Sequence, residues 1–238
     1  MRDLFIREIA LRRPFPNDDY PFDLPVVKHL ERLTLTSPVT FLAGENGAGK
    51  STLLEAVAVN FGFNAEGGSK NFHFSTAETH SVLSGYTVLA KGVRRPEDGF
   101  FLRAESFYNL ATEIERIEAF RPYGGRSLHA QSHGESFIAL MTHRFWGNGL
   151  YLMDEPEAAL SPTGQLAVLR LLSDLVKSGS QCVISSHSPI LMAFPGAQIF
   201  VIGETGIRET PYEETEHYQV TKQFLNAPEQ MLRELFRD

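Results

Sequence analysis

A glycine-rich stretch at residues 44–52, Gly-Glu-Asn-Gly-Ala-Gly-Lys-Ser-Thr, contains the residue types that hold a polyphosphate. Its glycines allow backbone conformations that a Cβ atom excludes, so successive amide N–H groups can converge on one anion. Lys50 would reach the terminal phosphates of a nucleotide, and the Ser51 hydroxyl would ligate Mg²⁺, which prefers hard oxygen ligands. The stretch therefore predicts a phosphate-binding loop.

The residues that flank this loop support the prediction. The apolar run 38–43 before it has the composition of a buried strand, and the apolar residues after it recur at helical spacing. A helix that begins near Lys50 would add the positive end of its dipole. The alternative is an ordinary strand-to-helix turn with an incidental lysine. The residues expected to bind the nucleotide are Gly44, Asn46, Gly47, Ala48, Gly49, Lys50, Ser51 and Thr52.

Two carboxylates follow a second apolar run. Residues 149–153 read Gly-Leu-Tyr-Leu-Met, and Asp154 and Glu155 come directly after them. At the carboxyl end of a parallel strand beside a phosphate-binding loop, Asp154 can hold Mg²⁺ through a water, and Glu155 can polarise an attacking water. The alternative is a polar strand end before a turn at Pro156. The pair predicts Mg²⁺-dependent attack on a nucleotide phosphate with Glu155 as the base.

Strands and helices alternate in the second half of the chain. We predict a helix at 134–146, a strand at 150–153, a helix at 162–177 and a strand at 181–185. A short helix near Pro189, a strand at 198–202 and two closing helices at 215–225 and 228–236 follow. This order indicates a largely parallel sheet covered by helices on both faces. Predicted strands at 4–11 and 30–36 form an antiparallel β layer before the loop. The expected fold class is therefore α/β.

The middle of the chain is less regular. Residues 62–80 are polar and glycine-rich, and they precede predicted strands near 86–91 and 99–105 and a helix at 107–120. We interpret 62–127 as an insertion in a core that is formed by 1–61 and 128–238. At 238 residues, the chain has the length of a single domain, 1–238.

The cysteine content, the net charge and the apolar runs of the chain limit the classes of protein to which it can belong. Cys182 is the only cysteine and lies in an apolar run, which predicts a buried strand residue rather than a reactive thiol. The net charge of −7 gives no general attraction to nucleic acid or to an anionic membrane surface. The charged first residues and the absence of an apolar run of about 18 residues lead us to expect a cytoplasmic protein.

Two further motifs make the sequence resemble the ATP-binding-cassette (ABC) ATPases. Residues 131–136, Gln-Ser-His-Gly-Glu-Ser, are similar to the signature motif of that family, and residues 185–189, Ser-Ser-His-Ser-Pro, are similar to its switch-histidine loop. The resemblance implies that Ser132, Gly134 and Glu135 cap the γ-phosphate of an ATP bound to a second copy. It also implies that His187 bonds the γ-phosphate of the ATP bound to its own chain and senses its loss. A plain helix N-cap at Ser132 and a structural histidine remain the alternatives.

The resemblance covers about 1–60 and 128–205. The sequences of two motifs, Gly-Glu-Asn-Gly-Ala-Gly-Lys and Ser-x-Gly-Glu, are more similar to those of the soluble SMC-like and RecF-like P-loop NTPases of the AAA type than to those of transporter subunits. The resemblance implies ATP and Mg²⁺ as cofactors and an ATP-dependent homodimer, with Lys50, Glu155 and His187 as catalytic residues. The implied client is nucleic acid or a defence pathway. A nucleotide-binding subunit of a membrane transporter and a slow nucleotide-gated interaction module are the alternatives.

One motif of the family is missing. ABC ATPases usually have a glutamine loop between the first glycine motif and the signature, yet no Gln occurs between Thr52 and Ala130. An oxygen ligand for Mg²⁺ or water would then come from another polar side chain of the middle segment. The candidates are Asn64, Glu66, Asn71 and Glu78.

Overall fold

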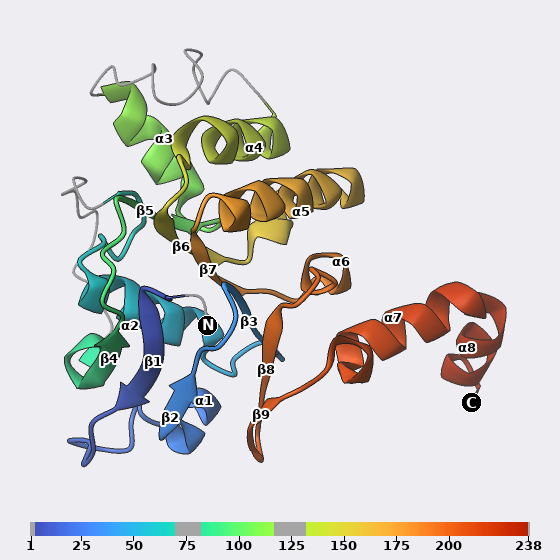
Figure 1. Cartoon of the computed structure of the whole chain (residues 1–238). Helices are drawn as coiled ribbons and strands as arrows, with labels where there is room; N and C mark the ends of the chain where they lie inside the picture. The colour runs from blue at the N-terminus through green and yellow to red at the C-terminus, as the bar shows by residue number, and fades with distance from the viewer. Residues whose placement is uncertain (1–2, 70–81, 117–131, 238) are drawn as a thin grey trace.

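The computed structural model describes residues 3–69, 82–116 and 132–237. It is an α/β structure built on a six-stranded sheet of order β5-β6-β7-β3-β8-β9 and a three-stranded sheet of order β2-β1-β4 (Figure 1). The large sheet is parallel from β5 to β8, and only its edge strand β9 is antiparallel. The small sheet is antiparallel throughout. The predicted fold class is confirmed.

The elements have the following bounds. The strands are β1 (Ile6–Leu11), β2 (Arg32–Thr34), β3 (Val39–Gly44), β4 (Thr87–Lys91), β5 (Asp98–Arg103), β6 (Gly149–Asp154), β7 (Gln181–Ser185), β8 (Gln198–Gly203) and β9 (Gly206–Glu209). The α-helices are α1 (Pro25–His29), α2 (Lys50–Phe61), α3 (Phe107–Arg116), α4 (His133–Arg144), α5 (Pro162–Lys177), α6 (Pro189–Met192), α7 (Glu216–Asn226) and α8 (Pro228–Leu235). Short 3₁₀ helices occupy Val82–Tyr86, Pro156–Ala159 and Tyr212–Glu214.

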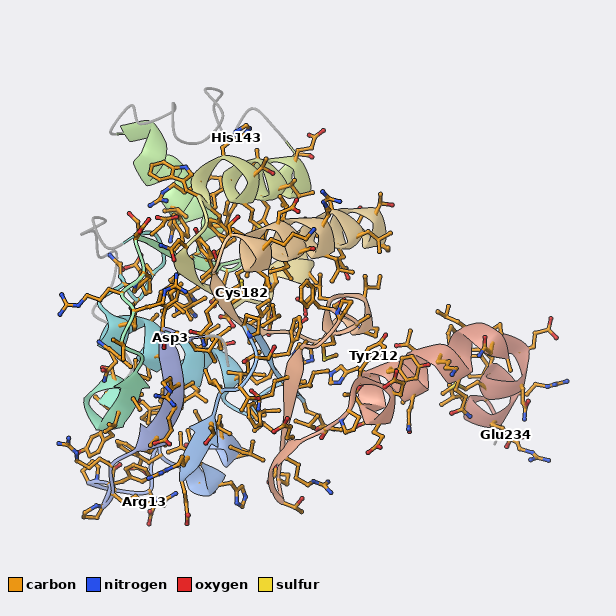
Figure 2. The ribbon with its side chains drawn as sticks, in the orientation of Figure 1. Asp3, Arg13, His143, Cys182, Tyr212 and Glu234 are labelled. Carbon is orange, nitrogen blue, oxygen red and sulfur yellow. The ribbon has the colours of Figure 1, made fainter. Side chains whose placement is uncertain are left out.

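The core has two halves, one on each face of the large sheet. Successive strand residues point to opposite faces, so Leu42 packs with α2 and the small sheet, whereas its neighbour Phe41 packs with the side of α4, α5 and α6. The central strands are buried along their whole length. Cys182 is the second residue of β7 (Figure 2) and is fully buried, as predicted. Burial raises the pKa of its thiol to about 12.

The described part of the segment 62–127 contributes one strand to each sheet. Its first strand, β4, pairs with β1, and its second strand, β5, pairs with β6 next to the carboxylate pair. β5 is apolar on both faces because it is covered on both sides, like the other parallel strands. The described part of the expected insertion is therefore built into the sheets of the core.

A buried ionic cluster joins the amino ends of β5 and β6 to α4. The Asp98 carboxylate accepts hydrogen bonds from the Arg144 guanidinium at 2.7 Å and from the Tyr151 hydroxyl at 2.7 Å. The side chains of Asp98 and Arg144 are only 9% and 11% exposed. Burial opposes ionisation of Asp98, but these bonds outweigh it and lower the pKa of the carboxyl.

We expect Asp98→Ala to reduce the free energy of unfolding by about 3–5 kcal/mol, because it leaves the buried Arg144 charge without its partner. Denaturant titration measures the change. Asp174→Ala is the matched control, since the Asp174–Arg170 pair lies on the surface of α5 and such pairs contribute about 0.2–1 kcal/mol. Equal effects of the two substitutions would contradict the prediction.

The C-terminal helices α7 and α8 project away from the sheets (Figure 1). The large apolar side chains that they expose are Val220, Phe224, Leu225, Leu232 and Leu235. Within the described ranges, no helix combines the length and the apolar character that crossing a membrane requires.

Candidate nucleotide site

The glycine-rich loop follows β3 and leads directly into α2, as predicted. Gly49 is the N-cap residue of α2 with φ 91°, in the left-handed region that glycine enters without strain. A Cβ atom on Gly49 would lie 2.6 Å from Cγ1 of Val26. The Val26 amide also donates to the carbonyl oxygen of Ala48 at 3.0 Å. The short helix α1 therefore packs against the loop and supports it.

Lys50 is held inside the loop. Its side chain is buried, and its Nζ donates to the carbonyl oxygens of Gly44 at 2.9 Å and Glu45 at 2.8 Å. Burial lowers the pKa of the ammonium, and the carboxylates of Glu155 and Asp154 act in the opposite direction. The arrangement presents a point charge where a phosphate bound to the loop would lie.

Asp154 ends β6 and is buried beside two neighbouring strands. Its Oδ1 accepts a hydrogen bond from the Ser185 hydroxyl at 2.5 Å, and its Oδ2 lies 3.6 Å from Nε of Arg103. Arg103 also donates to the Glu55 carboxylate on α2 at 2.9 Å. Asp154 and Arg103 are register partners across β6 and β5. Arg103 therefore holds the Asp154 carboxylate from one side, and Ser185 holds it from the other. Arg103 was not predicted as a site residue from the sequence.

Glu155 presents its carboxylate to solvent beside the loop. Its backbone has φ 48°, a left-handed conformation, and its amide donates to the carbonyl oxygen of Ser185 at 3.1 Å. The side chain is 41% exposed, and its Oε1 lies 3.6 Å from Nε2 of His187. A carboxylate in this position can accept a proton from a water in the cleft.

His187 follows β7 and reaches the same place. Its amide donates to Oε1 of Glu157 at 2.5 Å. Burial, together with the charge of Lys50 and the neighbouring His217, lowers the pKa of its imidazole to about 4. His217, on α7, has its Nε2 3.4 Å from Nδ1 of His187. The sequence analysis singled out only His187, and no pattern in the sequence connects the two histidines.

Two clefts adjoin these residues. The larger, about 910 Å³, lies between the loop residues 44–48, the end of β8 and α7, and both His187 and His217 line it. The smaller, about 310 Å³, is lined by Ser51, Asp154 and Glu155 together with Ala104 and Glu105 of the segment after β5. The predicted phosphate-binding residues and the predicted metal ligands are thus brought to one edge of the sheet.

Ser51 and Asp154 fit a Mg²⁺ ion. Both offer oxygen atoms to the smaller cleft, and Mg²⁺ usually takes only one or two protein ligands and completes its shell with phosphates and waters. Among the described residues there is no cluster of three acidic, histidine or cysteine side chains that would hold a metal by itself. Ser51 and Asp154 would therefore supply two oxygen ligands to a Mg²⁺ ion in this cleft.

Two of the four expected substitutes for the glutamine loop, Asn64 and Glu66, lie among the described residues. Asn64 accepts a hydrogen bond from the amide of Glu66 in its own turn, and neither residue lines the two clefts. Asn71 and Glu78 lie outside the described residues. Glu105 was not among the predicted substitutes for the glutamine loop. It is the polar residue after β5 that lines the smaller cleft with Ser51 and Asp154.

The signature-like residues open α4 as a capping box. The Ser132 hydroxyl accepts a hydrogen bond from the amide of Glu135 at 3.4 Å, and the Glu135 carboxylate accepts from the Ser132 amide at 3.0 Å and from its hydroxyl at 2.7 Å. These bonds lower the pKa of Glu135. A Cβ atom on Gly134 would lie 3.0 Å from the carbonyl oxygen of Ala159. Ser132 is thus the N-cap residue of α4, and Ser132, Gly134 and Glu135 line neither cleft of their own chain.

Known proteins resemble this chain in sequence and in fold. The AAA domain family matches residues 22–106. The hemin import ATP-binding protein HmuV of Nocardia farcinica is 30% identical over 184 residues, which are 68% of this chain and 62% of that protein. The cobalt import ATP-binding protein CbiO of Salmonella paratyphi A is 26% identical over 231 residues, 85% of this chain and 84% of that protein.

A solved structure of similar fold is that of cbiO1 from Clostridium perfringens, described as part of the ABC transporter complex cbiONQ. It aligns with a TM-score of 0.54 and 16% identity over 94% of this chain and 97% of that chain. The fold, the phosphate-binding loop and the relatives agree with the resemblance seen in the sequence. The chain belongs to the ABC-type P-loop ATPases, the enzymes that bind and hydrolyse ATP.

Proposed function

We propose that the chain binds Mg·ATP on residues 44–52 and hydrolyses it between two copies that are arranged head to tail. The observation that carries the proposal is the meeting of the loop, the Asp154–Glu155 pair and His187 at the carboxyl ends of three adjacent parallel strands. Ligands of open α/β sheets bind at this edge. The signature-like helix end lies outside the clefts of its own chain, which supports a role for it in the site of a second copy.

Each residue of the site has a role in this proposal. Glu155 takes the proton of the attacking water, while Lys50 and a neutral His187 donate hydrogen bonds to the phosphoryl oxygens. Ser51 and Asp154 hold Mg²⁺, which when bound neutralises part of the phosphate charge. Arg103 and Ser185 position Asp154. The remaining ligands of the phosphates are the backbone amides of Gly44, Asn46, Gly47, Ala48, Gly49 and Thr52.

The second copy would complete the site with the start of its α4. A helix N-terminus that offers a serine hydroxyl and unhindered backbone amides favours a phosphate. In the single chain the Glu135 carboxylate occupies this position through its bonds to Ser132. A γ-phosphate approaching from the second copy would replace that carboxylate as the hydrogen-bond partner of Ser132, and Glu135 would turn away. Nucleotide binding would in this way be coupled to dimer formation.

We treat residues 1–238 as a single ATPase domain, for which three biological roles are considered. The names of the two relatives are those of import subunits, which supports a role in energising a membrane partner. The motif sequences of the phosphate loop and of the signature support a nucleic-acid or defence role instead. Because the net charge is −7, nucleic acid would have to bind at a local basic patch. A slow nucleotide-gated module is the third possibility. The transporter role has the stronger support, because it comes from the relatives themselves.

The test is ATP turnover of the purified chain, with and without DNA, measured together with its molar mass in Mg·ATP. We expect turnover that needs Mg²⁺ and a dimer that needs ATP. Stimulation by DNA that weakens as salt rises would support the nucleic-acid role. Co-purification with a polytopic membrane protein would support the transporter role, and turnover slower than dimer dissociation would support the gated module. A chain that neither binds nor hydrolyses Mg·ATP contradicts the proposal.

A further inference from the structure

His217 is held against His187 by the start of α7. The buried Thr215 is the N-cap residue of this helix, and its hydroxyl donates to the carbonyl oxygen of Tyr212 at 2.7 Å. The Tyr212 hydroxyl in turn donates to the carbonyl oxygen of Pro189, the first residue of α6, at 2.9 Å. The first turn of α7 is therefore fastened to the segment that carries His187. The 3.4 Å contact between His217 Nε2 and His187 Nδ1 follows from this attachment.

Both imidazoles are neutral near pH 7. Burial is the main cause that lowers the pKa of each ring, and the charge of Lys50 acts in the same direction on both. The other charged groups around the pair are Glu155, Glu157 and Glu216, of which Glu216 raises the pKa of His217 without reversing the shift. A neutral imidazole has one N–H and one acceptor nitrogen. Only one of the two facing nitrogens can then carry the shared proton.

The surroundings favour one of the two possible arrangements. If Nε2 of His217 donates to Nδ1 of His187, the proton of His187 lies on its Nε2 and faces the Glu155 carboxylate at 3.6 Å. In the reverse arrangement, a lone pair of His187 faces that carboxylate. Nε2 of His187 and Nδ1 of His217 are both buried atoms without a hydrogen-bond partner among the described residues, so either arrangement leaves one of them as an N–H. The Glu155 carboxylate decides between them, because an N–H that faces a carboxylate is attracted to it, whereas a lone pair that faces it is repelled.

We infer that His217 is a positioning residue, which donates to Nδ1 of His187 and so holds the switch histidine in the tautomer that is protonated at Nε2. The inference rests on the proposed function, because this tautomer is the one that can donate to a γ-phosphate oxygen, whereas the other presents a lone pair to an anion.

Two substitutions test the role of the His217 N–H. His217→Gln keeps an N–H donor on a side chain of similar reach, and His217→Leu removes the donor while keeping an apolar side chain. We expect His217→Leu to lower kcat about tenfold and to change the KM for ATP by less than about twofold. A tenfold loss is the effect expected when the single hydrogen bond from His217 to His187 is removed. His217→Gln should restore kcat to within about threefold of the wild type.

The matched control is His143→Leu, because His143 is exposed on α4 and lies away from Tyr212 and the start of α7 (Figure 2). It should turn over at the wild-type rate. Circular dichroism and the melting temperature establish that each variant is folded. These measurements separate a positioning role from a loss of structure, because a merely structural role would lower the melting temperature and would not be rescued by glutamine.

The tautomer is read directly in the wild-type chain without nucleotide. In ¹⁵N spectra of labelled histidines we expect the His187 proton on Nε2, with Nδ1 as a hydrogen-bond acceptor, and a changed Nδ1 resonance in His217→Leu. A wild-type His187 protonated at Nδ1 overturns the inference, as does a folded His217→Leu that turns over like the wild type or a His217→Gln that is as slow as the leucine variant. A wild type with the expected tautomer and no ATP turnover contradicts the proposed function instead.

Discussion

Glu155→Gln should abolish ATP turnover while the chain still binds Mg·ATP. Glutamine keeps the shape of the side chain that lies 3.6 Å from His187, but its amide cannot take the proton of the attacking water. A positioned general base contributes about 10²–10⁴ in rate. We therefore expect phosphate release to fall by about that factor, with an unchanged affinity for ATP in an equilibrium binding measurement.

The same variant should accumulate as a dimer, because the ATP that closes the pair is no longer consumed. Glu229→Gln on the exposed surface of α8 is the matched control and should hydrolyse ATP like the wild type. If Glu155→Gln released phosphate at the wild-type rate, the base would be another group and the assignment of the site would be wrong.

Lys50→Ala should remove most of the affinity for ATP. The ammonium is buried and held by the carbonyl oxygens of Gly44 and Glu45, so it requires no rearrangement to meet a phosphate. Truncating one partner of a buried, hydrogen-bonded charge pair costs about 2–5 kcal/mol, which corresponds to a weakening of about 30-fold to several thousand-fold. Binding of a fluorescent ATP analogue measures the loss.

A thermal shift gives an independent measurement of the same change. A ligand that binds only the folded chain raises the melting temperature according to its concentration relative to Kd. ATP should therefore stabilise the wild type and leave Lys50→Ala almost unchanged. Lys177→Ala, at the exposed end of α5, is the control and should respond to ATP like the wild type. Equal responses of wild type and Lys50→Ala would exclude the loop as the nucleotide site.

The parts of the site that were predicted from sequence share a local signal. The glycines and Lys50 lie within one short stretch, and Asp154 and Glu155 directly follow a short apolar run that indicates a buried strand. Their meeting in space could also be predicted, because the carboxyl ends of parallel strands share one edge of a sheet. Cys182 was predicted to be buried for the same reason.

The parts that were missed depend on contacts between distant segments. Arg103 could be recognised only once β5 was paired with β6, since this pairing makes it the register partner of Asp154. His217 meets His187 because Thr215 and Tyr212 fasten α7 to α6, and neither bond has a sequence pattern. The helix α1 is too short for its periodicity to be read.

The central claim is that one triphosphate is held by the loop of one copy and by the start of α4 of another. Its most direct test is the molar mass in Mg·ATP of Glu155→Gln and of the same chain that also carries Ser132→Arg, whose longer side chain would fill the phosphate position at α4. We expect a dimer for the first and a monomer for the second, with equal ATP binding by both. A monomer for the first chain, or a dimer for both, would contradict the account.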